Sequence, residues 1–290
     1  MKNCAILTMD NLRDLSCYDN LTYAPLNQLG WGVHEISWRD RQVNWNDFDA
    51  VIIRSPWDYQ NSPSEFLAVL NDIENSSALL ANSLDVVNWN LNKKYLAQLE
   101  QKGVTIVPTI WNDQFSQNLL SQAFNLLQTN ELILKPAISA NADDTFRLNK
   151  SEAIDTANLQ QLFAKRDFMI QPFMSSIIDE GEYSLFYFNS KYSHSILKRP
   201  NSGDFRVQED HGGRLLKIEP EKTLSDTAES ALSAIPFQTL YARLDFVRFG
   251  DKFAMMEAEL IEPSLYFNMD EYSAARFAKA FDDFYQQRAA

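Results

Sequence analysis

The order of short apolar runs is the feature of this sequence that most constrains its fold. Within residues 1–90, the runs CAILTM, VHEISW and DAVIIRS alternate with stretches of helical spacing, NLTYAPLNQLG and PSEFLAVLNDIE. Uninterrupted apolar runs of this length are typical of strands buried on both faces of a parallel sheet, in which helices connect the strands. The N-terminal part is therefore predicted to be a small α/β unit.

Beyond residue 90 the pattern changes. The stretch NLNKKYLAQLEQKG predicts a helix capped by Asn90 and ended by Gly103. The strands TIVPTIW and ELILKPAI follow with a helix between them, and then the helix SEAIDTANLQQLFAKR and the strand FMIQPF. After these, EYSLFYFN, KYSHSILKR, GRLLKIEP, RLDFVRFG and KFAMMEAEL succeed one another as in an antiparallel sheet. The chain ends in an amphipathic helix whose apolar face is expected to contain Tyr272, Phe277, Ala280, Phe281 and Phe284.

These patterns predict a protein that combines α/β and α+β units. We expect a parallel-sheet domain over 1–90, a small α+β unit over 91–168 and a mainly antiparallel unit over 169–290. No repeat or low-complexity linker marks the borders, so the boundaries depend on the changes of pattern alone.

Composition limits the classes of partner. The formal net charge of −13 argues against nucleic acid, because binding a phosphate backbone requires clustered Lys and Arg. Cys4 and Cys17 are the only cysteines, which excludes a disulfide framework and a cysteine-based zinc site. The sequence has no window that resembles a membrane span or a secretion signal, so we expect a cytoplasmic protein without a membrane partner. The pattern leaves the oligomeric state open, and a homodimer is one alternative.

Acidic residues interrupt an apolar strand near the C-terminus. In FAMMEAELIEPS, Glu257 and Glu259 are two positions apart and so share a strand face, and a turn at residues 250–251 would bring Asp245 beside them. Three carboxylates on one face require a neutralising cation, and oxygen ligands suit Mg²⁺ or Mn²⁺. A solvated sheet face that carries acids is the alternative, and the residues alone favour neither interpretation. Glu262 follows at the strand end and is assigned at most to shaping a pocket.

Basic residues stand out against the acidic background. Lys135 ends the apolar run LILKP, where it would either reach solvent or contact a phosphate. The next residues, SANADDTF, suit a flexible cover over phosphates, although no glycine-rich nucleotide loop occurs anywhere in the chain. The segment SILKRPNSGDFRVQEDHGGRL indicates a phosphate or carboxylate site, the alternative being a loop merely rich in charge. Its cations are Lys198, Arg199, Arg206 and Arg214.

Two further segments could bind a flat ring and a sugar. The strand end from Gln171 to Met174 could turn its backbone groups toward a ring. Glu182 follows a turn at Gly181 and could accept hydrogen bonds from a ribose, although a carboxylate at a turn needs no function.

Taken in this order, the segments resemble the ATP-grasp superfamily of carboxylate–amine or carboxylate–thiol ligases. The resemblance covers nearly the whole chain and rests on NKKYL, LILKP, MIQPFM, EGEYSL, KRPNSGDFRVQEDHGG and the Asp…Glu-x-Glu strands. The loop is similar to that of glutathione-synthetase-like and ribosomal-protein glutamate-ligase-like members. The segments RSPWDY, FMIQPF, EGEYSL and ELIEPSL are similar to those of a subgroup that includes the D-cycloserine-forming cyclo-ligase. The resemblance implies an ATP-grasp fold that follows an N-terminal parallel-sheet domain.

The resemblance also implies roles for single residues. Contacts to the ATP phosphates are expected from Lys94, or its neighbour Lys93, and from Lys135. Adenine and ribose are expected to lie against Gln171, Phe173, Met174 and Glu182. The expected ligands of Mg²⁺ or Mn²⁺ are Asp245, Glu257 and Glu259, the last of which replaces the Asn of many members. The expected catalytic residues, at an acyl phosphate or a substrate carboxylate, are Arg206 and Arg243. In the phosphate cover, SANA replaces the usual glycines, which puts the mobility of that loop in doubt.

The implied reaction activates a small amino-acid-like carboxylate with ATP for attack by an amine, which in some members belongs to the same molecule. The residues expected to contact the substrate are Arg54, Trp57, Asp58 and Tyr59, although the two aromatic side chains could equally serve in core packing. Two alternatives stay open: an ATP-grasp kinase that phosphorylates a small molecule, and a non-catalytic nucleotide-binding module.

Overall fold

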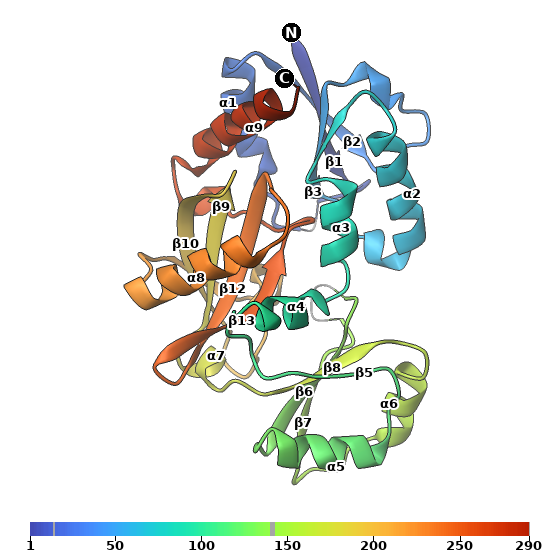
Figure 1. Ribbon diagram of the computed structural model, residues 1–290, viewed down its shortest axis with the longest axis vertical. Coiled ribbons are helices and arrows are strands. Elements are labelled where there is room, and N and C mark those ends of the chain that lie inside the picture. Colours follow the sequence, from blue (N-terminus) through green and yellow to red (C-terminus); the bar gives the residue numbers. More distant parts are fainter. Residues whose placement is uncertain (14, 140–142, 290) are drawn as a thin grey trace.

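The computed structural model describes residues 1–13, 15–139 and 143–289, which form three sheets arranged along the long axis of the molecule (Figure 1). A four-stranded parallel sheet lies at one end and a four-stranded antiparallel sheet at the other, with a five-stranded antiparallel sheet between them. This arrangement confirms the predicted combination of α/β and α+β units.

The N-terminal sheet is parallel throughout, as predicted. Its strands, in spatial order, are β2 (Trp31–Ser37), β1 (Lys2–Thr8), β3 (Ala50–Ser55) and β4 (Leu79–Ala81). Every residue of β3 is buried, which explains its continuous apolar run. The sequence pattern missed β4 because that strand is only 3 residues long.

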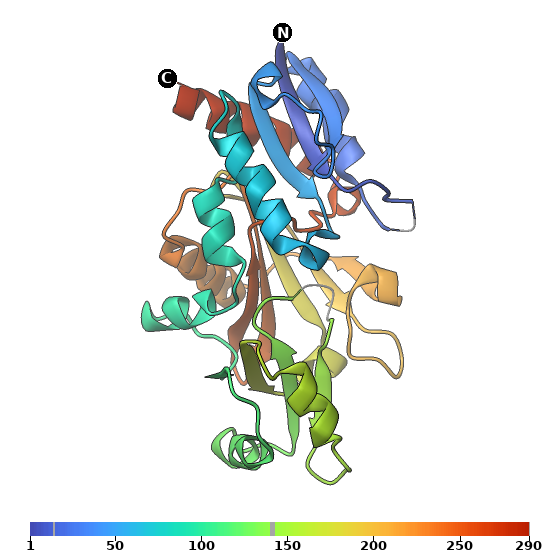
Figure 2. The same ribbon diagram turned by 90° about the vertical axis from the view of Figure 1, so that its right-hand side faces the viewer.

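Helices cover both faces of the N-terminal sheet. α1 (Tyr23–Gln28) and α2 (Pro63–Glu74) come from the same unit, and α2 buries Phe66 and Ile73 against one face. The last helix, α9 (Ser273–Ala289), returns from the far end of the chain to the other face, as Figures 1 and 2 both show. The ring of Phe281 lies 4.6 Å from that of Trp31 in β2. Tyr272 was wrongly predicted to join this face, because it precedes the helix and is 62% exposed.

The small sheet at the opposite end carries its own core. Its strands, in spatial order, are β5 (Ile110–Asn112), β8 (Phe168–Pro172), β6 (Glu131–Pro136) and β7 (Phe146–Asn149). α5 (Gln117–Leu126) and α6 (Thr156–Leu162) cover one face. Because side chains alternate along a strand, Leu132 and Leu134 of β6 enter this core, whereas Ile133 and Lys135 line a pocket on the other face.

The helices α3 (Leu84–Asn90) and α4 (Tyr95–Gln101) connect the N-terminal unit to the small sheet. Gly103 follows α4 with φ +91°, which confirms the predicted helix end. The predicted cap at Asn90 is wrong, since Asn90 is the last residue of α3 and Lys94 precedes α4. The Asn90 amide is buried and bonds the backbone of Ala258 and Leu260, so it holds the end of the strand that carries the acidic pair.

The middle sheet contains the five predicted strands in an antiparallel arrangement. In spatial order they are β11 (Arg214–Lys217), β10 (Lys191–Arg199), β9 (Glu182–Phe188), β12 (Tyr241–Phe249) and β13 (Lys252–Glu259). α8 (Lys222–Ala234) packs on one face, and the short α7 (Ser176–Asp179) precedes β9. Single 3₁₀ turns lie at Asp19–Thr22, Trp45–Asp47, Tyr59–Asn61, Glu209–His211 and Phe267–Met269.

The division of the chain into units follows these sheets. β8 pairs within the small sheet, so the predicted border at residue 168 falls at the first residue of that strand; the domain boundaries themselves stay predictions.

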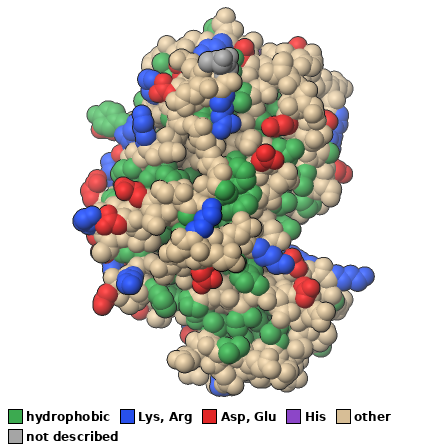
Figure 3. Space-filling model, in the orientation of Figure 1, with side chains coloured by type: hydrophobic (Ala, Val, Ile, Leu, Met, Phe, Trp, Pro, Cys, Tyr) green, Lys and Arg blue, Asp and Glu red, His purple; other side chains and the backbone are tan. Residues whose placement is uncertain are grey.

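Figure 3 shows charged and hydrophobic side chains interspersed on one face, and the outline narrows where the small-sheet unit joins the rest. In the described parts of the chain, no helix is both long and apolar enough to cross a membrane.

Candidate active site

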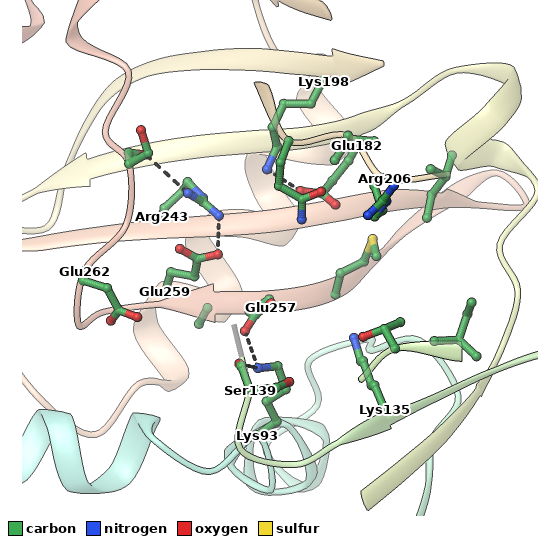
Figure 4. A pocket seen from close by; sticks show the side chains of 18 of the residues that line it. Lys93, Lys135, Ser139, Glu182, Lys198, Arg206, Arg243, Glu257, Glu259 and Glu262 are labelled. Carbon is green, nitrogen blue, oxygen red and sulfur yellow. Dashed lines mark hydrogen bonds and ion pairs between the residues drawn. The ribbon is translucent and has the colours of Figure 1, made fainter. Parts of the chain in front are cut away.

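A pocket lies where the three units meet. Strands of the small and middle sheets line it together with the loop after β3 of the N-terminal sheet. Figure 4 shows its charged side chains. Lys93, just before α4, and Lys135 of β6 face the carboxylates and cations of the middle sheet across the pocket. Most of the residues predicted to bind ATP and metal lie here.

The β12–β13 hairpin sets the register of the acidic residues. Asp245 pairs with Glu257 and Arg243 pairs with Glu259, and a bulge follows Asp245. Glu257, Glu259 and Arg243 all line the pocket. The predicted hairpin and the shared face of Glu257 and Glu259 are therefore confirmed.

Arg243 lies between two of these carboxylates. Its Nε and Nη2 donate to Oδ2 of Asp245 at 3.1 and 3.0 Å, and Nη2 also pairs with Glu259. Burial by itself would raise the pKa of Asp245, but Arg243 and Lys198 hold that pKa below its usual value. Burial raises the pKa of Glu259 to about 8 in spite of Arg243. Arg243 therefore favours the ionised form of Asp245, whereas burial favours the neutral form of Glu259.

Lys198 joins two carboxylates of neighbouring strands. Its side chain is 4% exposed, pairs with Glu182 directly opposite it on β9, and lies 3.6 Å from Oδ1 of Asp245. Burial acts to lower the pKa of Lys198, but Asp245 and Glu182 keep that pKa above its usual value. Burial raises the pKa of Glu182 despite this lysine. The sequence indicated Lys198 only as one cation of a loop; pairing EYSL with SILKR would have placed it opposite Glu182.

Of the two adjacent lysines, Lys93 lies in the pocket and Lys94 does not. Lys93 is 6% exposed, pairs with Oε1 of Glu257 at 3.0 Å and donates to the backbone oxygen of Ser139 at 2.5 Å. Lys94 pairs instead with Asp167 at 2.7 Å on the surface, because successive residues at a helix start point to different sides. The expectation for Lys94 is corrected to its neighbour, the alternative that the sequence left open.

Lys135 enters the pocket from β6 as predicted. Burial lowers the pKa of its ammonium group. No carboxylate of the described residues lies within 4.0 Å of it, so its charge is available to an anionic ligand. The following residues 140–142, which belong to the predicted phosphate cover, lie outside the described residues.

The strand end predicted to hold adenine forms one wall of the pocket. Gln171, Phe173 and Met174 all line it. The amide nitrogen of Gln171 donates to Thr109 at 2.9 Å, and the Arg147 guanidinium lies 3.7 Å from the centre of the Phe173 ring. The wall therefore combines the Gln171 amide with the apolar side chains of Phe173 and Met174, and contacts from outside the pocket hold it in place.

The four predicted substrate-reading residues separate into two pairs. Arg54 is 1% exposed and pairs with Asp19 at 3.0 Å, and Asp58 accepts hydrogen bonds from Trp38 and Arg39 at 2.6 and 2.8 Å. Neither lines the pocket, since Arg54 belongs to the fully buried β3 and Asp58 turns back toward its own unit. The structure thus places both residues outside the pocket, and their predicted roles at a substrate gain no support from it.

Trp57 and Tyr59 line the pocket, and both contact Glu262. Nε1 of Trp57 donates to the backbone oxygen of Glu262 at 2.9 Å, and the nearby Tyr59 hydroxyl acts to lower the pKa of its carboxyl group. Burial raises the pKa of Glu262 to about 7. Glu262 was predicted at most to shape a pocket; the sequence signal for a larger role is a carboxylate directly after a buried strand end.

The basic loop after β10 contributes only part of its charge. Arg206 lines the pocket and pairs with Asp204 at 2.8 Å. Arg199 donates to the backbone oxygen of Glu180, and Arg214 is exposed on β11; neither lines the pocket. The loop reaches the N-terminal unit, where Tyr18 donates to Glu209 at 3.0 Å.

Glu257 and Glu259 fit a divalent cation in donor chemistry. Their side chains are 29% and 30% exposed within the pocket, and the charge of Glu257 raises the energetic cost of ionising Glu259. Asp245 is 3% exposed, and its oxygens accept from Arg243 and Ser184. Over 1–13, 15–139 and 143–289, no three His, Cys, Asp or Glu side chains are arranged to hold a metal ion. Of the three predicted ligands, Glu257 and Glu259 therefore fit a divalent cation in the pocket. The role of Asp245 as a third ligand stays a prediction.

Known proteins are similar to this chain in sequence and in architecture. A family profile described as the N-terminal domain of D-cycloserine synthetase DcsG matches residues 4–82. The cycloserine biosynthesis protein DcsG of Streptomyces lavendulae is 31% identical over 262 residues, which cover 84% of this chain and 85% of that protein. A crystal structure of D-cycloserine synthetase DcsG superposes with a TM-score of 0.85 at 27% identity, covering 98% of this chain and 99% of the other.

More distant structures share the fold. D-alanine–D-alanine ligase from Bacillus anthracis superposes with a TM-score of 0.66 at 11% identity, covering 99% of this chain and 98% of that one. The ATP-grasp ligase PsnB gives a TM-score of 0.66 at 16% identity, covering 97% and 99%. The predicted resemblance is thereby confirmed. The chain belongs to the ATP-grasp family of ligases related to D-cycloserine synthetase.

Proposed function

We propose that the pocket binds ATP and a small amino-acid-like carboxylate, and that the protein is an ATP-dependent ligase that forms a C–N bond. The observation that carries the proposal is the charge arrangement: Lys93 and Lys135 on one side of the pocket face the Arg243–Asp245–Glu259 cluster on the other (Figure 4). A triphosphate that transfers its terminal phosphoryl group needs cations on both sides of the moving charge.

The nucleotide is assigned to the side of the small sheet. Lys93 and Lys135 would bind its phosphates, while Gln171, Phe173 and Met174 would contact the adenine ring. Glu182 would accept hydrogen bonds from the ribose, which would compete with its ion pair to Lys198. This assignment uses every predicted nucleotide residue except Lys94.

Mg²⁺ is assigned to Glu257 and Glu259, with Asp245 as a further ligand. When bound, Mg²⁺ would offset phosphate charge and the repulsion between the two glutamates. Binding would also draw Glu257 away from Lys93, which would free that ammonium group for a phosphate oxygen. Titration with Mn²⁺ in the assay below tests the choice of metal.

The reaction is assigned in two steps. A substrate carboxylate oxygen attacks the terminal phosphorus of ATP, the bond to the bridging oxygen breaks, and ADP and an acyl phosphate form. An amine then attacks the acyl carbon, phosphate leaves with the C–O bonding electrons, and the nitrogen loses a proton. Arg243 and Arg206 would stabilise charge on the transferring group and on the acyl oxygen. When the amine belongs to the same molecule the product is a ring, the outcome named for the relative D-cycloserine synthetase.

The test is a screen for ADP release with Mg²⁺ or Mn²⁺, using amino acids, dipeptides and ureido or hydroxylamine derivatives. We expect release to depend on a carboxylate substrate and to yield an amide or ring with free phosphate. A stable phosphorylated product would instead indicate the kinase alternative. Protein that fails to bind ATP would contradict the proposal.

A further inference from the structure

Glu262 is a carboxylate that lines the pocket, and the described residues in contact with it carry no positive charge. It follows β13, lies at one end of the group of side chains drawn in Figure 4, and lines the pocket together with residues of the N-terminal unit. Its backbone oxygen accepts a hydrogen bond from Nε1 of Trp57, and the Tyr59 hydroxyl lies near enough to its carboxyl group to act on its pKa. The Tyr59 ring stacks on Phe66, with ring centres 4.6 Å apart, so the hydroxyl is held in place.

The other carboxylates of the middle sheet that line the pocket have their own cations. Glu182 pairs with Lys198, Glu257 with Lys93 and Glu259 with Arg243. In the described parts of the chain, no Lys or Arg lies within 4.0 Å of Glu262. Lys93 and Arg243 are the cations whose charge reaches it, but each forms its ion pair with another glutamate.

A half-buried carboxylate without a cation is stabilised when a ligand supplies one. The pocket wall around Glu262 also contains two aromatic rings, and such rings attract ammonium groups through their faces. An ammonium ion that reaches Glu262 would replace lost solvation with a charge-assisted hydrogen bond. A carboxylate or phosphate would be repelled by the ionised form of Glu262.

We propose that Glu262, flanked by Trp57 and Tyr59, forms a subsite that binds a primary ammonium group of the substrate. The inference rests on the proposed function and assigns a residue to the amino group of its amino-acid-like substrate. Glu262 acts as a binding and positioning residue in this assignment, since it orients the amino group while the carboxylate points toward Arg243 and the phosphates. The amino group held at Glu262 is therefore not the nucleophile.

The experiment compares D-cycloserine with isoxazolidin-3-one, the same ring without its amino group. Binding of each is measured by calorimetry to the full chain in the presence of ADP and Mg²⁺. We expect the wild-type protein to bind D-cycloserine about ten- to a hundredfold more tightly, the range for one charge-assisted hydrogen bond. Glu262→Gln should abolish this preference by weakening D-cycloserine binding alone, and Glu262→Asp should restore part of it.

Glu152→Gln is the matched control, because Glu152 is exposed after β7 and does not line the pocket. It should keep the wild-type preference. A Glu262→Gln protein that still prefers D-cycloserine, or a wild-type protein that binds both rings equally while it binds ADP, would overturn the subsite. Wild-type protein that does not bind ADP would overturn the proposed function together with the subsite, so the two failures are distinguishable.

Discussion

Replacing Arg243 with Met tests how the acidic face is held together. The change removes the donors that Oδ2 of Asp245 receives at 3.1 and 3.0 Å and the cation paired with Glu259. Glu259 can then take up a proton, since its pKa is already raised to about 8. Asp245 cannot do so as easily, and its partners among the described residues are then Ser184 at 2.5 Å and Lys198 at 3.6 Å.

The expected loss follows from leaving a buried charge with weaker compensation. Removing one partner of a buried ion pair typically destabilises a protein by about 3–5 kcal/mol. Because Lys198 still compensates Asp245 in part, we expect a decrease of about 3 kcal/mol in the free energy of unfolding, measured by urea titration at pH 7. Adding Asp245→Asn to Arg243→Met should recover part of that loss.

Lys222→Met is the control, because Lys222 forms an i, i+4 pair with Asp226 on the surface of α8, with side chains 86% and 58% exposed. That pair should contribute nothing measurable. If Arg243→Met were as stable as Lys222→Met, or if Asp245→Asn did not reduce its effect, the account of the acidic face would be refuted.

Three further predictions concern other parts of the molecule. Burial lowers the pKa of His194 from 6.5 to about 4, so the unfolded state takes up the proton first; stability should fall by up to about 3 kcal/mol between pH 6.5 and 4, and His194→Phe should remove this slope. Lys93→Met should weaken ATP binding about ten- to a hundredfold in a calorimetric titration, whereas Lys94→Met should leave it unchanged. Glu257→Gln should raise the Mg²⁺ concentration for half-maximal ADP release at least about tenfold, since even indirect metal contacts have effects of that size.

Each of these has a clear contrary outcome. An unaltered pH slope in His194→Phe would mean that the imidazole is not held neutral against Phe186, where its ring lies 4.2 Å away. Equal effects of the two lysine changes would contradict the placement of Lys93 in the pocket. Unchanged Mg²⁺ dependence in Glu257→Gln would remove this residue from the metal site.

The strands were predictable because their side chains follow a simple period. Glu257 and Glu259 are two positions apart, so their common face needed no tertiary information, and one turn at Gly250 sufficed to place Asp245 beside them. Lys135 was also predictable, since alternation along β6 separates it from the core residues Leu132 and Leu134.

Residues outside regular strands were harder to predict because their neighbours come from distant segments. Arg54 lies outside the pocket because it bonds Asp19 and the backbone oxygen of Pro263 in the interior. Asn90 bonds a strand more than 160 positions away, which no local capping pattern can indicate. Lys93 and Lys94 differ in direction only through the exact start of α4, the kind of boundary that sequence patterns locate least well.

The proposed reaction places one oxygen of the substrate carboxylate in the released phosphate. The most direct test therefore uses an acid substrate from the ADP-release screen, labelled with ¹⁸O in its carboxylate, and mass spectrometry of the phosphate after one round of turnover. A reaction through an acyl phosphate predicts that the released phosphate carries one ¹⁸O atom and that the C–N-bonded product keeps the other. Phosphate without label, formed together with ADP, would contradict an acyl phosphate and with it the assignment of this pocket.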